Sequence, residues 1–123
     1  MNANYYGTTG YASFEPKQIV IKFMRKIILN NKNAIKYLEN NDIEEYVLRL
    51  NNSIHILEEL DLMLNRDTEN PTVDRVSLHY QWMIEVFESI VDKTDDMEFC
   101  LEQIKMTEPV INDLLEGFSE MRD

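Results

Sequence analysis

The chain has 123 residues, of which 44% are hydrophobic, and its formal net charge is −11. This length suits one domain with a core of its own, and the apolar content excludes an intrinsically disordered chain. Three glycines and three prolines cannot supply the many turns of a β-sandwich or barrel, and the negative charge argues against nucleic acid and anionic membranes as partners.

Residues 1–15 are expected to form a flexible N-terminal arm that carries three tyrosines, Tyr5, Tyr6 and Tyr11. Tyrosines are uncommon on a purely solvated tail, so the arm is expected either to fold back onto the body or to hold a partner. The arm has no apolar stretch typical of a signal peptide, and no run of about 18 apolar residues occurs in the chain. A cytoplasmic protein without membrane insertion is therefore expected.

The first helix is predicted over residues 17–38, because Pro16 suits a helix start and Asn40-Asn41 suits an end. Its stretch from Ile19 to Leu29 is apolar almost all round. Residues 1–40 contain six basic and two acidic side chains, whereas the rest contains six basic and 21 acidic ones. This asymmetry has two interpretations: a basic first helix packed beside acidic ones, or a partner of mixed charge.

The second helix is predicted over residues 42–65, with Asp42 and Glu45 as a capping box. One apolar stripe recurs at steps of three and four and comprises Ile43, Val47, Leu50, Ile54, Leu57 and Leu64. A second stripe comprises Tyr46, Ile56, Leu60 and Met63. Periodicity does not decide which stripe faces the core.

The third helix is predicted over residues 72–92, after a loop that ends at Asn70-Pro71. Its main seam is Val76, Tyr80, Met83, Phe87 and Ile90, flanked by Leu78, Trp82 and Val86.

The fourth helix is predicted over residues 96–120, with a capping box at Asp95 and Glu98. Pro109 lies inside it and predicts a kink or break, because proline removes a helical hydrogen bond. Thr107 is placed to cap a short fifth helix beyond that break.

The predicted fold is all-α, an antiparallel four-helix bundle in a single domain, 1–123, with two-residue turns at 40–41 and 93–94. The helices carry more apolar surface than one stripe each requires. The surplus is explained by a thicker core, by a homodimer, or by grooves that bind amphipathic helices of a partner. The predicted partner-binding residues are Ile19, Phe23, Ile27, Leu50, Ile54 and Leu57.

Catalytic and metal-binding patterns are weak in this sequence, so neither an enzyme nor a cofactor or metal is expected. A di-iron bundle needs Glu three residues before His, but Asn52 precedes His55 and Val76 precedes His79 at that spacing. Cys100 lies in an apolar run and is expected in the core, whereas His55 is expected to face solvent.

Several segments resemble the FliS family of flagellin export chaperones. Pro16-Lys17-Gln18-Ile19-Val20 is similar to the Pro-x-x-Leu-Ile of that family and follows Tyr11-Ala12-Ser13. Ile56 to Leu60 is similar to its Ile-Leu-x-x-Leu segment, and Leu78 to Met83 to its Leu-Tyr-x-Tyr-Met segment. Phe23 to Lys26 departs from the Leu-Tyr-Asp-Gly of the family, so the resemblance is to a divergent member.

This resemblance implies a cytoplasmic chaperone that binds the disordered C-terminal region of flagellin in hydrophobic helix grooves. Such a chaperone prevents premature polymerisation, assists type III flagellar export and contacts other flagellar export proteins. The resemblance also implies that the N-terminal arm, anchored by its tyrosines, caps part of the groove. The alternative from a different class is a homodimeric helical-bundle adaptor without a chaperone role.

Overall fold

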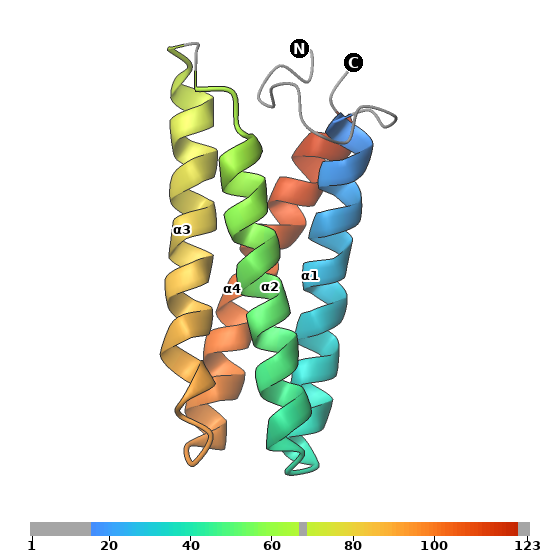
Figure 1. The fold of residues 1–123 in the computed structure, drawn as a ribbon, viewed down its shortest axis with the longest axis vertical. Helices are drawn as coiled ribbons and strands as arrows, with labels where there is room; N and C mark the ends of the chain where they lie inside the picture. Colours follow the sequence, from blue (N-terminus) through green and yellow to red (C-terminus); the bar gives the residue numbers. More distant parts are fainter. Residues whose placement is uncertain (1–15, 67–68, 121–123) are drawn as a thin grey trace.

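The computed structural model describes residues 16–66 and 69–120, which fold into a bundle of long helices (Figure 1). The helices are α1 (Pro16–Glu39), α2 (Ile43–Met63), α3 (Pro71–Val91) and α4 (Met97–Glu120). These bounds differ by at most two residues from the predicted ranges 17–38, 42–65, 72–92 and 96–120. The three arm tyrosines lie outside the described residues.

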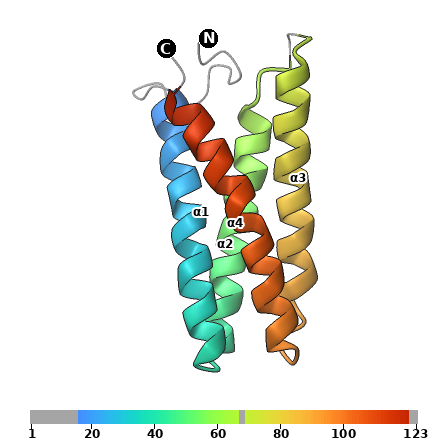
Figure 2. The ribbon, with the colours of Figure 1, turned by 180° about the vertical axis from the view of Figure 1, so that it is seen from behind.

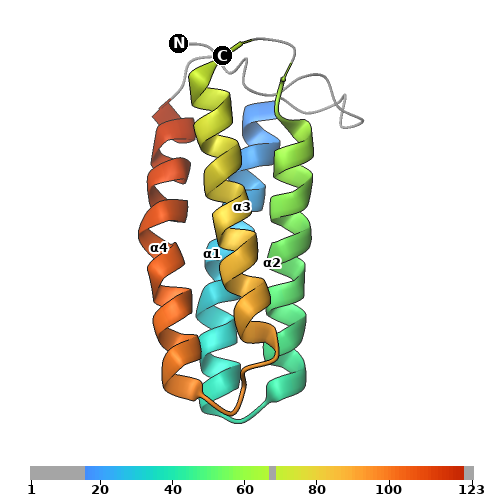
Figure 3. The same cartoon turned by 90° about the vertical axis from the view of Figure 1, so that its left-hand side faces the viewer.

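The helices form a closed antiparallel ring, so each packs against two neighbours: α1 against α2 and α4, and α3 against α2 and α4. Figure 1 shows the 40–42 and 92–96 turns at the lower end of the bundle and the α2–α3 loop at the upper end. Figure 3 shows the same order from the side, with α3 in front. In Figure 2, α4 runs obliquely, and its upper half leans toward α1 and away from α3.

The core takes side chains from all four helices and confirms the predicted α3 seam, whose five members are all buried. On α2 the structure buries the whole second stripe, Tyr46, Ile56, Leu60 and Met63. Only half of the first stripe is buried with it, since Ile43, Val47 and Ile54 remain partly exposed. The core face of α2 therefore lies between the two stripes and draws on both.

The turn from α1 to α2 depends on the backbone of Asn41, which is left-handed with φ 57°. The Asp42 N–H donates to Tyr37 O at 2.7 Å and the Asn41 N–H donates to Leu38 O at 3.0 Å, the paired bonds of a Schellman motif. The Asp42 side chain then caps α2 by accepting from the Glu45 N–H at 3.4 Å. The Glu45 carboxylate pairs with Arg49 at 3.4 Å instead of reaching back, so only one half of the predicted capping box is seen.

Two predictions for the last helix are corrected by the structure. The cap is Asp96, which accepts from the Phe99 N–H at 3.1 Å, because the helix begins at Met97, one residue later than expected. The predicted fifth helix does not form within the described residues, since α4 continues through Pro109 to Glu120. Pro109 lies on the exposed side, where water can satisfy the carbonyl that loses its helical partner. Thr107 caps nothing: it is fully buried and donates to Ile104 O at 2.7 Å.

Polar side chains also enter the interior along α1. The Asn30 amide donates to Asn52 Oδ1 at 2.8 Å and to Ser53 Oγ at 3.0 Å, joining α1 to α2. The Asn31 amide donates to Thr107 Oγ1 at 3.0 Å, joining α1 to α4. The side-chain oxygens of Asn30 and Asn31 are buried without a hydrogen-bond partner among the described residues. Such a group costs free energy unless water or a ligand satisfies it.

Candidate partner-binding surface

The six residues predicted to bind a partner divide into two groups in the structure. Ile19, Ile27, Leu50 and Leu57 are buried in the core, at most 6% exposed. Phe23 and Ile54 are partly exposed at the edge of the core. A bound chain can reach the first four only if helices move apart, whereas Phe23 and Ile54 are within reach of the surface. The structure therefore does not gather the six into one open groove.

A different set of apolar side chains lies outside the main buried seams of α3 and α4. On α3, Leu78 is 63% exposed and Trp82, one turn further along, is partly buried. On α4, Met106 is 50% exposed, and Val110 and Leu114 follow at steps of four and are partly buried. We call these five residues the α3–α4 flank.

The α4 members of this flank lie on the side of α4 that is turned away from the hollow shared with α1. Glu108 and Asn112 line a hollow shared with α1. Met106 and Val110 each stand two residues from one of these, and two residues turn about 200° around a helix axis. Figure 2 shows that the upper half of α4 leans away from α3. The flank is thus a strip of apolar surface open to solvent.

The lower end of the α3–α4 seam is fastened by a buried polar group. The Tyr46 hydroxyl donates to Ile90 O at 3.1 Å, and the Cys100 thiol donates to Ile90 O at 3.8 Å and Lys93 O at 3.2 Å. Burial raises the pKa of the Tyr46 phenol above its ordinary value, and neighbouring Cys100 raises it further. The phenol is therefore held neutral, as its role as a hydrogen-bond donor requires.

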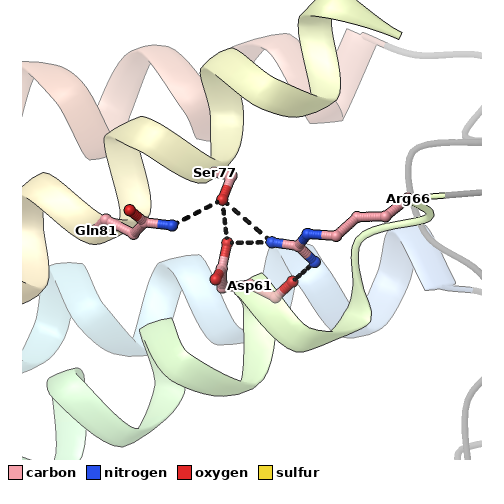
Figure 4. Close-up of polar contacts among 4 residues, drawn as sticks. All are labelled: Asp61, Arg66, Ser77 and Gln81. Carbon is pink, nitrogen blue, oxygen red and sulfur yellow. Dashed lines mark hydrogen bonds and ion pairs between the residues drawn. The ribbon is translucent and has the colours of Figure 1, made fainter. Parts of the chain in front are cut away.

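The upper ends of α2 and α3 are joined by the polar network in Figure 4. The Ser77 hydroxyl donates to Asp61 Oδ1 at 2.6 Å, and Arg66 Nη2 donates to the same oxygen at 2.9 Å. Arg66 Nη1 donates to Asp61 O at 2.6 Å, and Gln81 Nε2 donates to Ser77 Oγ at 3.2 Å. The network binds the α2 end to α3, so the α2–α3 seam is a poorer candidate for opening than the α3–α4 flank.

A half-open hollow of about 410 Å³ lies between α1 and α4. Its apolar lining comes from Ile28 and Ile35 of α1 and Ile111 of α4. Its polar lining consists of Asn31, Lys32, Lys36, Glu39, Glu108 and Asn112. It is a second concave surface, distinct in chemistry from the α3–α4 flank.

The described part of the chain offers little support for a catalytic or metal-binding site. No group of three metal-ligating side chains occurs within residues 16–66 and 69–120. His55 is solvent-facing as predicted, and its ring lies 3.7 Å from the Glu58 carboxylate. Cys100 is buried as predicted. Across the same ranges, no helix is long and apolar enough to cross a membrane.

The whole chain, residues 1–123, matches a known protein family described as Flagellar protein FliS. This chain belongs to the FliS family. The family consists of non-enzymatic chaperones of flagellin export, and its members bind flagellin. The four-helix bundle confirms the all-α fold predicted from the sequence. No individual curated protein matches the chain.

The sequence identified Leu78 and Trp82 as residues that flank the main seam of the third helix, but it did not join them with Met106, Val110 and Leu114 in one surface. The signal was present, because each lies outside the main seam of its own helix. Periodicity does not give the rotation of α4 relative to α3, and this rotation decides whether apolar residues outside the two main seams lie close together. Asn31 was missed altogether, since its partner Thr107 is 76 residues away.

Proposed function

We propose that this chain is a cytoplasmic chaperone that binds the disordered C-terminal region of flagellin on hydrophobic helix surfaces. Binding would hold those segments apart from other flagellin molecules, prevent premature polymerisation and deliver the monomer to type III export and its other flagellar proteins. Family membership supports a flagellin partner. The α3–α4 flank is the observation that carries the choice of surface.

The energetics favour an apolar strip of this kind. A disordered client loses conformational entropy when it orders on the chaperone, so the complex needs apolar burial to offset that cost. An amphipathic client helix would place its side chains at i, i+3, i+4 and i+7 along the seam. Leu78 and Met106 offer exposed contact area, and Trp82 offers an aromatic anchor of the kind that dominates interfaces.

The residues predicted from sequence enter this proposal in two ways. Phe23 and Ile54 are proposed as further client contacts, at the edges of their helices. Contact with Ile19, Ile27, Leu50 and Leu57 would require the client to separate core helices, so their main effect is expected on stability. The proposed role of Tyr5, Tyr6 and Tyr11 as a displaceable cap over the client surface concerns residues outside those described.

The test compares two double variants of the full chain by calorimetry with a flagellin C-terminal peptide. Leu78→Ala with Met106→Ala truncates the α3–α4 flank, and we expect the Kd to rise at least tenfold. Leu48→Ala with Leu62→Ala truncates two exposed leucines of α2, 53% and 77% exposed, and the Kd is expected to stay within twofold. Thermal melts of both variants check that the fold is kept.

The wild-type titration is also expected to show a negative heat-capacity change, the mark of apolar burial. An absence of binding at micromolar concentration would reject the flagellin client. Equal losses in the two double variants would reject the α3–α4 flank as its surface.

The alternative function is a homodimeric adaptor, and one observation favours it. Leu48 and Leu62 are both exposed and stand 14 residues apart, so they lie on one face of α2. Paired α2 helices would cover this face. Light scattering across concentration decides, because Leu48→Ala with Leu62→Ala should dissociate such a dimer and leave a monomeric chaperone unaffected.

A further inference from the structure

The outward face of α1 carries a line of positive charge on a chain whose net charge is −11. The line runs the length of the helix and comprises Lys22, Arg25, Lys26, Lys32 and Lys36, all exposed. Arg25, Lys26, Lys32 and Lys36 form no ion pair with another described residue. We call this line the α1 basic stripe. Like charges on neighbouring turns of a helix repel one another, so an acidic occupant would relieve that repulsion.

An apolar ridge borders the α1 basic stripe on the side that faces α4. Ile21, Ile28 and Ile35 are partly buried and stand seven residues apart, so they lie on one line along the helix. Ile28 and Ile35 line the α1–α4 hollow together with Lys32 and Lys36 of the stripe. Figure 2 shows α1 and α4 side by side over this stretch. The stripe, the ridge and the hollow are therefore one continuous surface.

A third feature of the same surface is an unsatisfied hydrogen-bond acceptor. Asn31 lines the hollow and is 2% exposed, and its Oδ1 has no donor among the described residues. The observation indicates that a donor from outside the described chain, a water molecule or a bound group, completes this site. The hollow thus combines apolar walls, a rim of two lysines and two glutamates, and a buried amide oxygen.

We infer that this surface docks an acidic amphipathic helix of a partner protein, at a site separate from the α3–α4 flank. The helix lays an aliphatic side chain against each of Ile21, Ile28 and Ile35. Its carboxylates on one flank face Arg25, Lys32 and Lys36. One aliphatic side chain enters the hollow beside Ile28 and Ile35.

The spacing of the ridge sets the form of the occupant. Contacts seven residues apart on α1 match a second helix that crosses at a shallow angle, as in a coiled coil, and not an extended strand. From Ile21 to Ile35 the ridge is about 21 Å long, which about four turns of helix would cover. Glu39 and Glu108 at the edge of the hollow favour one basic or neutral residue on the far flank of the partner.

Other occupants fit the same surface less well. In a symmetric pair of this chain the two α1 basic stripes would face each other and repel. A head-to-tail pairing of the stripe with the acidic remainder of a second copy would not close and would grow into chains. Nucleic acid or an anionic membrane would meet the net charge of −11 at longer range. A short acidic helix docked along α1 would contact the α1 basic stripe and not the acidic remainder of the chain.

The probe is a labelled helical peptide of about 21 residues with leucine at every seventh position and glutamate on one flank. Its binding to the full chain is measured by fluorescence polarisation. Arg25→Glu with Lys32→Glu is expected to raise the Kd at least tenfold. The matched control, Arg75→Glu with Lys105→Glu, makes the same charge change on α3 and α4 and should stay within twofold. Ile28→Ala should weaken binding, whereas Leu48→Ala should not.

Three results would overturn the inference. The first is equal binding of a peptide with lysine in place of glutamate. The second is equal loss in the two charge-reversed variants. The third is capture of anionic vesicles or duplex DNA through the stripe in preference to the peptide. Arg25→Glu with Lys32→Glu should still bind the flagellin peptide, so a failure here is distinguishable from a failure of the proposed function.

Discussion

The α1–α2 half and the α3–α4 half of the bundle are held together in different ways. In the first, the Asn30 amide crosses the seam at mid-length and Arg49 lies 5.7 Å from the centre of the Tyr37 ring. In the second, Cys100 and Ile90 join the helices near the lower turn, and Leu78 and Met106 are at least half exposed.

This difference suggests that one half of the bundle provides stability and the other half provides the surface for a partner. Hydrogen bonds that cross a seam need defined geometry, so the α1–α2 half tolerates little movement. Apolar contacts are non-directional, so above the Cys100–Ile90 bond the α3–α4 half can shift to admit a client while that bond holds its lower end. We therefore expect α1–α2 to supply the rigid frame and α3–α4 the adaptable surface.

The largest expected effect is on the free energy of unfolding when the frame loses a core side chain. Leu57→Ala should cost about 2–5 kcal/mol, because Leu57 is fully buried. Leu78→Ala should change it by no more than about 0.5 kcal/mol, because most of Leu78 is exposed. Urea denaturation measures both. Comparable losses would contradict the division between frame and surface.

A smaller effect is expected from the polar contacts of the α1–α2 seam. Asn30→Ala leaves the buried Ser53 hydroxyl without its donor and should cost about 1–3 kcal/mol in thermal or urea unfolding. Asn33→Ala is the matched control, the same substitution at a partly exposed position on the same helix, and should cost less. If Asn30→Ala were neutral, the seam would owe its rigidity to apolar packing alone.

The smallest effect concerns Tyr46 and depends on pH. Tyr46→Phe removes the bond to Ile90 O and should cost about 0.5–1.5 kcal/mol at neutral pH. Because the folded-state pKa is raised, the folded chain keeps the phenol proton at a pH where the unfolded chain loses it. The stability of the wild type should therefore fall as pH rises above about 10, the ordinary tyrosine pKa.

Urea titrations of the wild type and Tyr46→Phe at several pH values give the difference between their free energies of unfolding. The difference should be constant below that pH and shrink above it. A difference that grows with alkaline pH would mean that the phenol is ionised in the folded protein and that the lower end is not held as described.

The sequence predicts the four helices because apolar periodicity, Pro16, Asn70-Pro71 and the asparagine turn act locally. It misplaces the α4 cap by one residue because Asp95 and Asp96 are chemically equivalent until the first helical residue is fixed. It also predicts a kink or break at Pro109, and the break does not occur, since a proline on the exposed side costs the helix less than a buried one.

The candidate surfaces are harder to predict because they depend on how each helix is rotated about its axis. On α2, Tyr46 turns inward to reach Ile90 O, 44 residues away. That rotation brings Leu50 and Leu57 into the core and leaves Ile54 at its edge. Local periodicity sees both stripes as equal, so only the long-range hydrogen bond distinguishes them.

Trp82 is the single tryptophan of the chain and stands on the α3–α4 flank, half covered by its neighbours. Its indole emission should shift to shorter wavelength when a guest excludes solvent from that strip. A ligand seated along the outer side of α1 should leave the spectrum unchanged. The unlabelled protein thus carries its own optical reporter, which can tell which of two docking events has occurred.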